Sequence, residues 1–344
     1  MTGRRAQVAA SAAARRPPAR SRPLAAARWA AAAAVLLAGA GCGMTAARAT
    51  RLYAAPGSPL LPAAARLRAS GRAADADELT RIAGTPAGVW AAGQPGEMRL
   101  VRQVSRAAAR AHRVPVIVAY NLPGRDSCGR LSTAASLDRA GYERWVRQLA
   151  AAIGRGADIV VVEPDGLPDI VQGCLSPAAA AQRYLLLRYA MRRLGALPGA
   201  RVYLDAGNPG ITARPAPLAA PLERAGVGYG RGFAANVSNF QLTATVVAWS
   251  QQLEQALGGR ARAVIDTSRN GDGPYTGPDR PQWCNPPGRA LGPSPRLDPG
   301  PPGIDAYLWI KDPGASDGPC NGGPPAGQYW PQYALGLAWR APAG

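Results

Sequence analysis

The sequence predicts an α/β protein whose parallel strands close into a TIM-like (β/α) barrel. Three observations support this prediction. From Asp75 onward, short β-branched runs alternate with amphipathic stretches, which is typical of a parallel sheet with helical crossovers. The runs are almost continuously apolar, so we expect both faces of the sheet to be covered. Seven such runs fit a closed barrel better than an open sheet, and no glycine-rich phosphate loop follows any of them.

The elements are expected in a regular order along the chain. The first strand is predicted at Gly88–Ala91, and an Arg-rich helical stretch follows at Gln103–Arg113. Most of the strand runs are rich in β-branched residues, whereas the stretches between them repeat apolar residues at helical spacing. The later strands are predicted at Val116–Tyr120, Ile159–Val162, Arg201–Asp205, Gly232–Asn236, Ala263–Asp266 and Ile304–Ile310. The helices between them are predicted near Tyr142–Ile153, Ala178–Leu194, Leu218–Arg224 and Thr243–Leu257.

Residues 1–42 are expected to be a signal peptide. A basic segment precedes the apolar run Trp29–Ala40, which is shorter than the ~20 apolar residues of a membrane-spanning helix. Cys42 follows Gly39-Ala40-Gly41, which resembles a bacterial lipoprotein cleavage site, although Gly39 stands where Leu is usual. Simple cleavage and lipid attachment at Cys42 therefore both remain open. We expect an extracellular, secreted protein, with membrane contact only through a lipid at Cys42.

The formal charge of +19 does not indicate a nucleic-acid partner. Residues 1–74 hold 12 arginines and no acidic residue, which leaves 28 basic against 21 acidic residues in the rest. Those arginines are scattered, whereas nucleic-acid binders gather basic and stacking side chains on one surface. Residues 43–74 also lack periodicity, which indicates a tether, and residues 75–344 are expected to form the barrel domain. We expect a monomer.

The single histidine, His112, excludes several kinds of site. Ser-His-Asp and Cys-His nucleophilic sites, and zinc sites with two or more histidines, all need imidazole, and His112 could serve at most one of them. Its position in an Arg-rich helical stretch favours a plain polar residue near a helix end. Acid/base chemistry in this chain is therefore assigned to carboxylates.

The remaining cysteines indicate two disulfides. Their number is even in a chain expected to be exported, and three pairings are possible. Pairing neighbours in sequence would close a long loop in each half of the domain. Their spacing contains no C-x-x-C, so we expect neither a metal nor a redox site, and no cofactor. These cysteines are Cys128, Cys174, Cys284 and Cys320.

Carboxylates follow the predicted strands more often than helix capping explains. A single Asp after a strand commonly caps the next helix, but four of the seven strands end in Asp or Glu. Chemistry in such barrels lies at the carboxyl ends of the strands, and paired carboxylates are what glycoside hydrolysis needs. Trp90 and Trp283 could stack on sugar rings, whereas Trp309, inside a strand, is interpreted as core. The polar strand ends are Tyr120–Asp126, Glu163–Asp165, Asp205, Asn236–Asn239, Asp266, Ser268 and Lys311–Asp317.

Seven segments, in order, resemble the motifs of glycoside hydrolase family 6, the inverting endoglucanases and cellobiohydrolases. The resemblance covers residues 75–340 and implies a distorted seven-stranded barrel with an active-site groove. It also implies hydrolysis of β-1,4-glucosidic bonds in cellulose-like glucans without a metal or cofactor. The segments are Val118–Asp126, Val162–Asp165, Leu204–Gly207, Asn236–Asn239, Val264–Gly271, Trp283-Cys284 and Leu308–Lys311.

The resemblance assigns roles to individual residues. Asp165 matches the general acid, and Asp126 matches the aspartate that raises the acid's pKa and helps to order the catalytic water. Tyr120 matches the tyrosine that favours ring distortion, and Asp317 matches a third aspartate proposed as the base. Trp90, Asn239, Trp283 and Lys311 match substrate-binding positions. The family's disulfides correspond to Cys128 with Cys174 and Cys284 with Cys320.

Several positions depart from the family pattern. The departures predict weaker binding of long glucan chains, so a catalytically weak surface glycan-binding protein on the same fold, or a hydrolase of another β-glucan, stays open as an alternative. Short segments after Asp126 and Asp317 favour endo action. The sequence contains no recognisable carbohydrate-binding module, so we expect soluble or amorphous glucan to be preferred. The departures are Asn208 for His, Ile211 and Leu242 for Trp, Ala315 for Glu, Thr133–Ala135 for a Ser-Gly-Gly loop, and an inserted Ser127.

Overall fold

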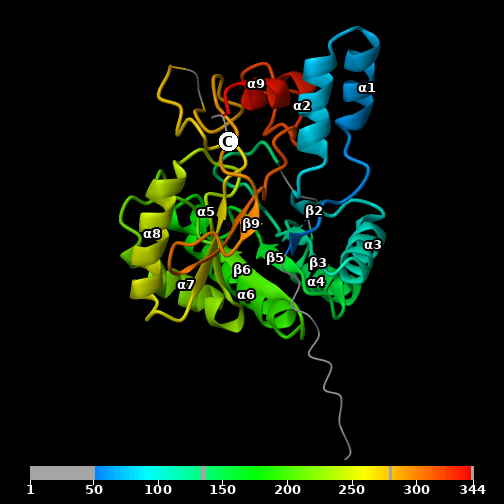
Figure 1. The fold of residues 1–344 in the computed structure, drawn as a ribbon. Helices are drawn as coiled ribbons and strands as arrows, with labels where there is room; N and C mark the ends of the chain where they lie inside the picture. The colour runs from blue at the N-terminus through cyan, green and yellow to red at the C-terminus, as the bar shows by residue number, and fades with distance from the viewer. Residues whose placement is uncertain (1–50, 133–136, 279–280, 342–344) are drawn as a thin grey trace, which may run out of the picture. The chain divides into compact units, whose positions relative to one another are not determined.

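The computed structural model describes residues 51–132, 137–278 and 281–341 (Figure 1). The predicted signal peptide with Cys42, the first part of the expected tether, and the Thr133–Ala135 loop lie outside the described residues. The described residues belong to one compact unit that comprises residues 47–344. None of their helices has both the length and the apolar character needed to cross a bilayer.

Seven parallel strands form the sheet, and they pair in the order of the chain. Each lies within a few residues of a predicted strand, which confirms the α/β barrel prediction. A short strand β9 (Arg296–Leu297) adds to the far edge in antiparallel orientation, and β1 (Arg51–Leu52) pairs separately with β3 (Arg113–Val114). The seven are β2 (Val89–Ala91), β4 (Val116–Ala119), β5 (Ile159–Val162), β6 (Arg201–Asp205), β7 (Gly232–Ala235), β8 (Arg262–Asp266) and β10 (Ile304–Leu308).

The barrel closes through a distorted seam between the first and last strands. An isolated parallel bridge joins Ala87 to Trp309, and the Gly88 amide donates to the Trp309 carbonyl at 2.8 Å. A Cβ at Gly88 would lie 2.3 Å from the Ile310 carbonyl oxygen, so this close approach requires glycine. The Trp90 indole donates to the same Ile310 carbonyl at 2.9 Å. The seam therefore carries far fewer backbone contacts than the other strand pairs, which is the distortion that the resemblance implied.

Side chains on alternate strand positions build two separate cores. Within β5, Ile159 and Val161 point into the barrel, whereas Val160 and Val162 point outward to the helices. All four are fully buried, because both faces of a parallel sheet are covered. The covering helices are α3 (Glu97–Arg110), α4 (Arg139–Ile153), α6 (Pro177–Gly195), α7 (Ala219–Ala225) and α8 (Thr243–Ala256). The single-turn helix α5 (Pro168–Val171) follows β5 at the carboxyl end of the sheet. His112 is exposed just beyond the end of α3.

Part of the expected tether is folded, so residue 75 is not a structural boundary. Helices α1 (Leu61–Ala69) and α2 (Ala73–Ala83) pack with α9 (Pro331–Trp339) in a third core that also holds the buried Trp309 (Figure 1). Leu60, Ala63, Ala64 and Leu67 form the apolar stripe of this segment at helical spacing. The neighbouring residues Ala65, Arg66 and Arg68 continue the Ala- and Arg-rich composition of the preceding segment, so the apolar stripe was not apparent in the sequence.

Candidate active site

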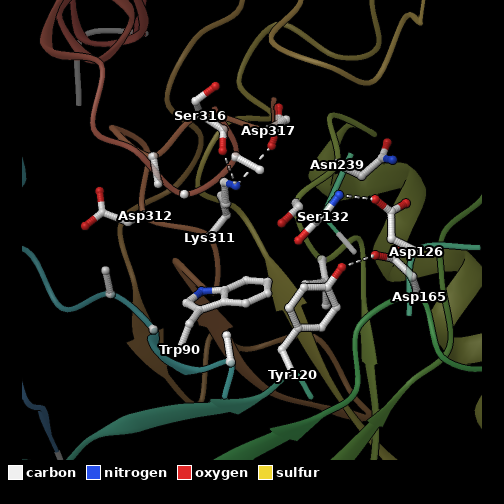
Figure 2. A pocket seen from close by; sticks show the side chains of 18 of the residues that line it. Trp90, Tyr120, Asp126, Ser132, Asp165, Asn239, Lys311, Asp312, Ser316 and Asp317 are labelled. Atoms are coloured by element: carbon white, nitrogen blue, oxygen red, sulfur yellow. Dashed lines mark hydrogen bonds and ion pairs between the residues drawn. The ribbon is translucent and has the colours of Figure 1, made fainter. Parts of the chain in front are cut away.

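A groove of about 1050 Å³ lies over the carboxyl ends of the barrel strands. Strands of a parallel barrel all end on this face, so the polar residues that follow them converge here. The structure brings together every residue to which the resemblance assigned a catalytic or substrate-binding role, and Figure 2 shows most of them. These residues are Trp90, Tyr120, Asp126, Asp165, Asn239, Trp283, Lys311 and Asp317.

Asp165 is the most strongly perturbed acid of the groove. It follows β5 in a left-handed conformation with φ of 67°, and its amide donates to Asp205 Oδ2 at 2.9 Å. The Tyr120 hydroxyl donates to its Oδ2 at 3.4 Å (Figure 2). Burial raises the pKa of Asp165 well above its ordinary value, and the charges of Asp205, Asp169 and Asp126 raise it further. These surroundings therefore favour the protonated form of the Asp165 carboxyl, which can act as a proton donor.

Asp126 lies beside Asp165 on the loop after β4. Its Oδ2 accepts the backbone amide of Leu131 at 2.7 Å. The same oxygen accepts the backbone amide of Ser132 at 2.6 Å (Figure 2). The preceding Arg125 holds this loop to the barrel, because its guanidinium donates to the carbonyls of Ser132 at 2.9 Å and of Tyr120. The same guanidinium lies 4.4 Å from the centroid of the Tyr120 ring. The loop thus presents an acceptor carboxylate next to the protonated one.

Asp317 lies on the other side of the groove among cations. Arg269 donates to both of its oxygens, at 2.8 and 3.0 Å, and Lys311 Nζ lies 3.1 Å from Oδ1. Burial alone would raise the pKa of Asp317, but Arg269 and Lys311 outweigh it and lower the pKa below its usual value. The Asn285 amide adds a hydrogen bond of 3.0 Å. Asp317 is therefore an ionised carboxylate whose oxygens are already engaged.

The aromatic residues of the groove are positioned to contact a ligand. Trp90 meets Tyr120 edge to face, with 5.2 Å between ring centroids, and Lys311 Nζ lies 5.9 Å from the Trp90 ring (Figure 2). Trp283 is 37% exposed, so its ring faces solvent in the groove. A Cβ at Gly129 would lie 3.0 Å from the Trp283 ring and 2.3 Å from Asp126 Oδ1, so glycine here lets the Trp283 ring approach the Asp126 loop closely.

Comparison with known proteins identifies the fold and the site together. The family model described as glycosyl hydrolases family 6 matches residues 47–341, which includes every residue of the groove named above. The chain belongs to glycosyl hydrolase family 6. Its structure is similar to the endoglucanase Cel6 of Mycobacterium tuberculosis solved with a thio-linked cello-oligosaccharide, with a TM-score of 0.75 and 37% identity. That match covers 85% of this chain and 97% of the other.

Two curated family 6 relatives show the same likeness in sequence. Endoglucanase A of Cellulomonas fimi is 42% identical over 267 residues, which are 76% of this chain and 56% of that protein. Endoglucanase 1 of Streptomyces sp. KSM-9 is 42% identical over 263 residues, 75% of this chain and 70% of that protein. The chain thus spans little more than half the length of the first of these relatives.

Some residues of this family 6 site were missed as site residues in the sequence. Asp205 and Arg269 lie within the recognised segments, yet neither was assigned a role. Burial raises the pKa of Asp205 to about 7, and Arg269 is fully buried against Asp317. Burial also raises the pKa of Glu163 to about 7, and its carboxylate accepts the amide of Leu122 at 2.9 Å behind the groove. The available signal for Glu163 and Asp205 was their position at the end of an apolar strand, which placed them among the polar strand ends without assigning them a role.

The positions that depart from the family pattern are not equivalent in the structure. Asn208 and Ile211 line the groove, and Asn208 Oδ1 accepts the amide of Gly210 at 2.9 Å. Leu242 is 46% exposed and precedes α8. Ala315 forms an isolated bridge with Tyr329 at the groove edge. Loss of the aromatic surface at position 211 therefore affects the groove directly.

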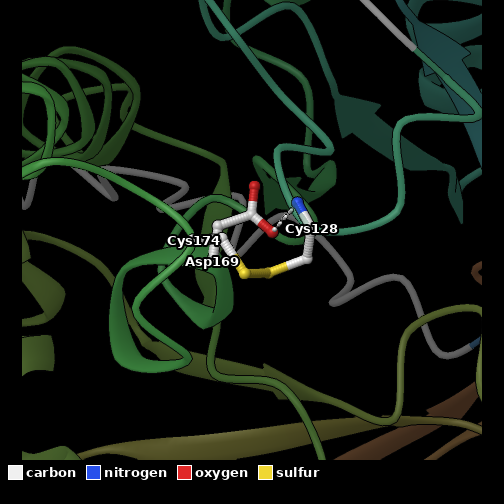
Figure 3. A group of neighbouring side chains, drawn as sticks. All are labelled: Cys128, Asp169 and Cys174. Atoms are coloured by element: carbon white, nitrogen blue, oxygen red, sulfur yellow. Dashed lines mark hydrogen bonds between the residues drawn. A yellow bond between two sulfur atoms is a disulfide. The ribbon is translucent and has the colours of Figure 1, made fainter.

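Both disulfides have the sequence-local pairing that the family resemblance implied. Cys128 pairs with Cys174 at a Cα separation of 5.3 Å, and Cys284 pairs with Cys320 at 6.1 Å. Asp169 lies close to the first pair (Figure 3). The two sulfur atoms are bonded to each other, so this cluster does not offer the thiolate ligands of a metal site. Each disulfide instead anchors a loop that carries a groove aspartate.

Proposed function

We propose that this chain is an inverting glycoside hydrolase that cleaves β-1,4-glucosidic bonds within cellulose-like glucans. One observation carries the proposal: a carboxyl that stays protonated, Asp165, faces the same groove as a carboxylate that stays ionised, Asp317. An inverting glycosidase needs this division between a proton donor and a group that favours attack by water. Its relatives in Cellulomonas and Streptomyces are endoglucanases, which supports the substrate class.

Asp165 supplies the proton in this mechanism. Its protonated oxygen faces the groove, where it can reach the glycosidic oxygen of a bound chain. Proton transfer lets the leaving sugar depart as an alcohol while positive charge develops on the ring of the other sugar. The Tyr120 hydroxyl stays protonated, because burial raises its pKa above the usual value, so it remains a hydrogen-bond donor beside Asp165.

Two carboxylates can direct the attacking water, and their surroundings differ. Asp317 is ionised across the working pH range, but its two cations weaken it as a proton acceptor. Asp126 accepts two backbone amides through Oδ2 and lies next to Asp165. We assign to Asp317 the role of an ionised carboxylate on the side of the groove opposite the acid Asp165. Kinetics of Asp126→Asn and Asp317→Asn with added azide identify the base, since azide rescues only a variant whose water activation has been lost.

Endo action is the cleavage mode we propose. The curated relatives and the M. tuberculosis structure are named endoglucanases, and a groove over the strand ends admits the middle of a chain. Hydrolysis of a soluble substituted cellulose should lower its viscosity faster than it releases reducing ends. Release of reducing ends with little loss of viscosity would show action from chain ends instead.

The decisive experiment is an incubation with cellopentaose followed by NMR. We expect the α-anomer to form first, because a single displacement inverts the anomeric centre. Asp165→Asn should lower kcat at least ~100-fold, the usual contribution of a positioned general acid. Near wild-type turnover in Asp165→Asn, or a β-anomer as first product, would refute the mechanism.

A second candidate, a glycan-binding protein with little turnover, is favoured by two observations. Both oxygens of Asp317 are engaged by Arg269, and the groove position of Ile211 lacks an aromatic ring. Calorimetric binding of cellopentaose without release of reducing sugar from the same sample would select this candidate.

We also propose that the mature protein acts outside the cell. Two disulfides favour an oxidising compartment, and the apolar run before Cys42 supports export. Expression of the full chain in a bacterial host with labelled palmitate, beside a Cys42→Ser control, measures lipid attachment. A lipoprotein should incorporate the label in the unsubstituted chain and not in the Cys42→Ser variant.

A further inference from the structure

A buried ion pair lies beneath the loop that carries Asp126. Arg183 of α6 donates through Nη1 to Asp169 Oδ2 of α5 at 2.9 Å, and both side chains are at most 4% exposed. Burying two charges costs several kcal/mol of desolvation, so such a pair contributes little stability by itself. Its further contacts show what it holds in place.

Both members of the pair bind the loop on either side of Asp126. The amides of Ser127 and Cys128 donate to the Asp169 carboxylate at 2.8 and 3.4 Å. Arg183 Nη2 donates to the Gly124 carbonyl and to Ser127 Oγ, the latter at 3.0 Å. Residues 124 to 128 are therefore fastened at both ends to one rigid pair.

The fastening matters because Asp126 has a strained backbone. Its φ is 53°, in the left-handed region that residues other than glycine seldom adopt because of steric strain. A loop free to relax would leave this conformation and move the carboxylate. Surrounding contacts must fix it, and the Asp169–Arg183 pair provides them.

Asp169 is also joined to the Asp165 segment by a backbone hydrogen bond, and a disulfide nearby joins the chain after Asp169 to the Asp126 loop. The Asp169 amide donates to the Asp165 carbonyl at 2.9 Å, one helical turn away, and the Asp169 carbonyl accepts the Cys174 amide at 3.0 Å. Cys174 is bonded to Cys128 of the Asp126 loop (Figure 3). Ion pair, disulfide and backbone thus join the segment of the acid to the loop of its neighbouring carboxylate.

We propose that Asp169 and Arg183 are positioning residues that fix the Asp126 carboxylate beside Asp165, and that Ser127 completes this contact. The inference rests on the proposed hydrolase function. Asp169 has an additional electrostatic effect, because its charge acts on Asp165 together with those of Asp126 and Asp205, while Tyr120 donates to the same carboxyl.

The test compares pH profiles of kcat for Asp169→Asn and Arg183→Lys on cellopentaose. Asp169→Asn removes one negative charge near Asp165, so the alkaline limb should move to lower pH by about 0.5 to 1 unit, with kcat about 10-fold or more lower. Arg183→Lys keeps the charge but cannot reach Asp169, Gly124 and Ser127 together, so kcat should fall with the limb unchanged. The double variant should lose less than the product of the two losses, because both act on one loop.

Matched controls separate positioning from stability. Asp305→Asn breaks a second buried carboxylate cluster, with Arg231 at 2.8 Å and Arg262 at 2.9 Å, near the amino end of β10 and away from the groove. It should lower the melting temperature while kcat and the alkaline limb stay at wild-type values. Ser127→Ala, in a partly exposed side chain, should fold normally and lower kcat about 2- to 5-fold, because the hydroxyl no longer accepts from Arg183 or donates to the Gly124 carbonyl.

Each outcome decides the proposal. Wild-type kcat and an unshifted limb in Asp169→Asn and Ser127→Ala, with Asp165→Asn inactive, would overturn the positioning pair and leave the proposed function intact. Full activity in Asp165→Asn would instead overturn the function itself. If Asp169→Asn does not fold, an unchanged kcat in folded Ser127→Ala and Arg183→Lys still overturns the inference.

Discussion

Asp158→Asn is expected to stabilise the protein at alkaline pH and to have much less effect in acid. Asp158 directly precedes β5 and is fully buried, and neither of its carboxylate oxygens has a hydrogen-bond partner among the described residues. Burial raises the pKa of Asp158 to about 7, while the neighbouring Ser105 hydroxyl acts in the opposite direction. The charged form of this carboxyl is therefore disfavoured in the folded protein.

The size and sign of the effect follow from proton linkage. The unfolded carboxyl has a pKa of about 3.9, so between that value and about 7 the folded state binds more protons than the unfolded state. The stability associated with Asp158 is full below about pH 4 and is lost as the pH rises through about 7. A difference of three units corresponds to about 4 kcal/mol, and asparagine has the same shape without this cost.

Urea unfolding at pH 5 and pH 8.5, with the disulfides intact, measures the effect. The quantity compared is the change in unfolding free energy on substitution at each pH, because the cost of a buried amide is common to both. Glu163 and Asp205, whose pKa values are also raised to about 7, are present in both proteins and cancel. Asp77→Asn, in a side chain that is 70% exposed, is the matched control. The reasoning fails if Asp158→Asn has the same effect at both pH values.

Three further predictions concern the groove and its supports. Trp283→Ala should raise KM for cello-oligosaccharides about 5-fold or more with kcat little changed, as loss of one stacking surface predicts, measured by steady-state kinetics. Arg269→Lys should raise the pKa of Asp317 and shift the acid limb of the kcat profile upward, since it removes the two-point contact; an unmoved limb would contradict this. Replacing Cys284 and Cys320 by serine should lower the unfolding free energy by about 4 kcal/mol for a loop of 36 residues, measured in urea against the wild type.

The sheet and the convergence of the groove residues could be predicted because they depend on local pattern. The run Ile159–Val162 is apolar at every position, and only a strand covered on both faces accommodates that pattern. Parallel strands all end on one face, so acids far apart in sequence meet once the strand order is known. The strand order alone therefore predicts that Asp126, Asp165 and Asp317 lie on the same face of the barrel.

Other features depend on contacts that no local pattern encodes. Half of the α1 stripe is alanine, whose apolar surface is too small to stand out in an Ala-rich chain. The barrel seam depends on Gly88 and on the reach of the Trp90 indole across it. Arg183 lies in a helix with other arginines, and nothing in its spacing distinguishes it from exposed ones. Its burial against Asp169 is a property of tertiary structure alone.

The contrast between Asp165 and Asp317 shows why residue type alone could not assign the chemistry. Both follow strands of one barrel and both face the same groove. Burial raises the pKa of each, but the charges that act on Asp165 are carboxylates, whereas Arg269 and Lys311 act on Asp317. The sign of the neighbouring charge therefore decides which aspartate keeps its proton.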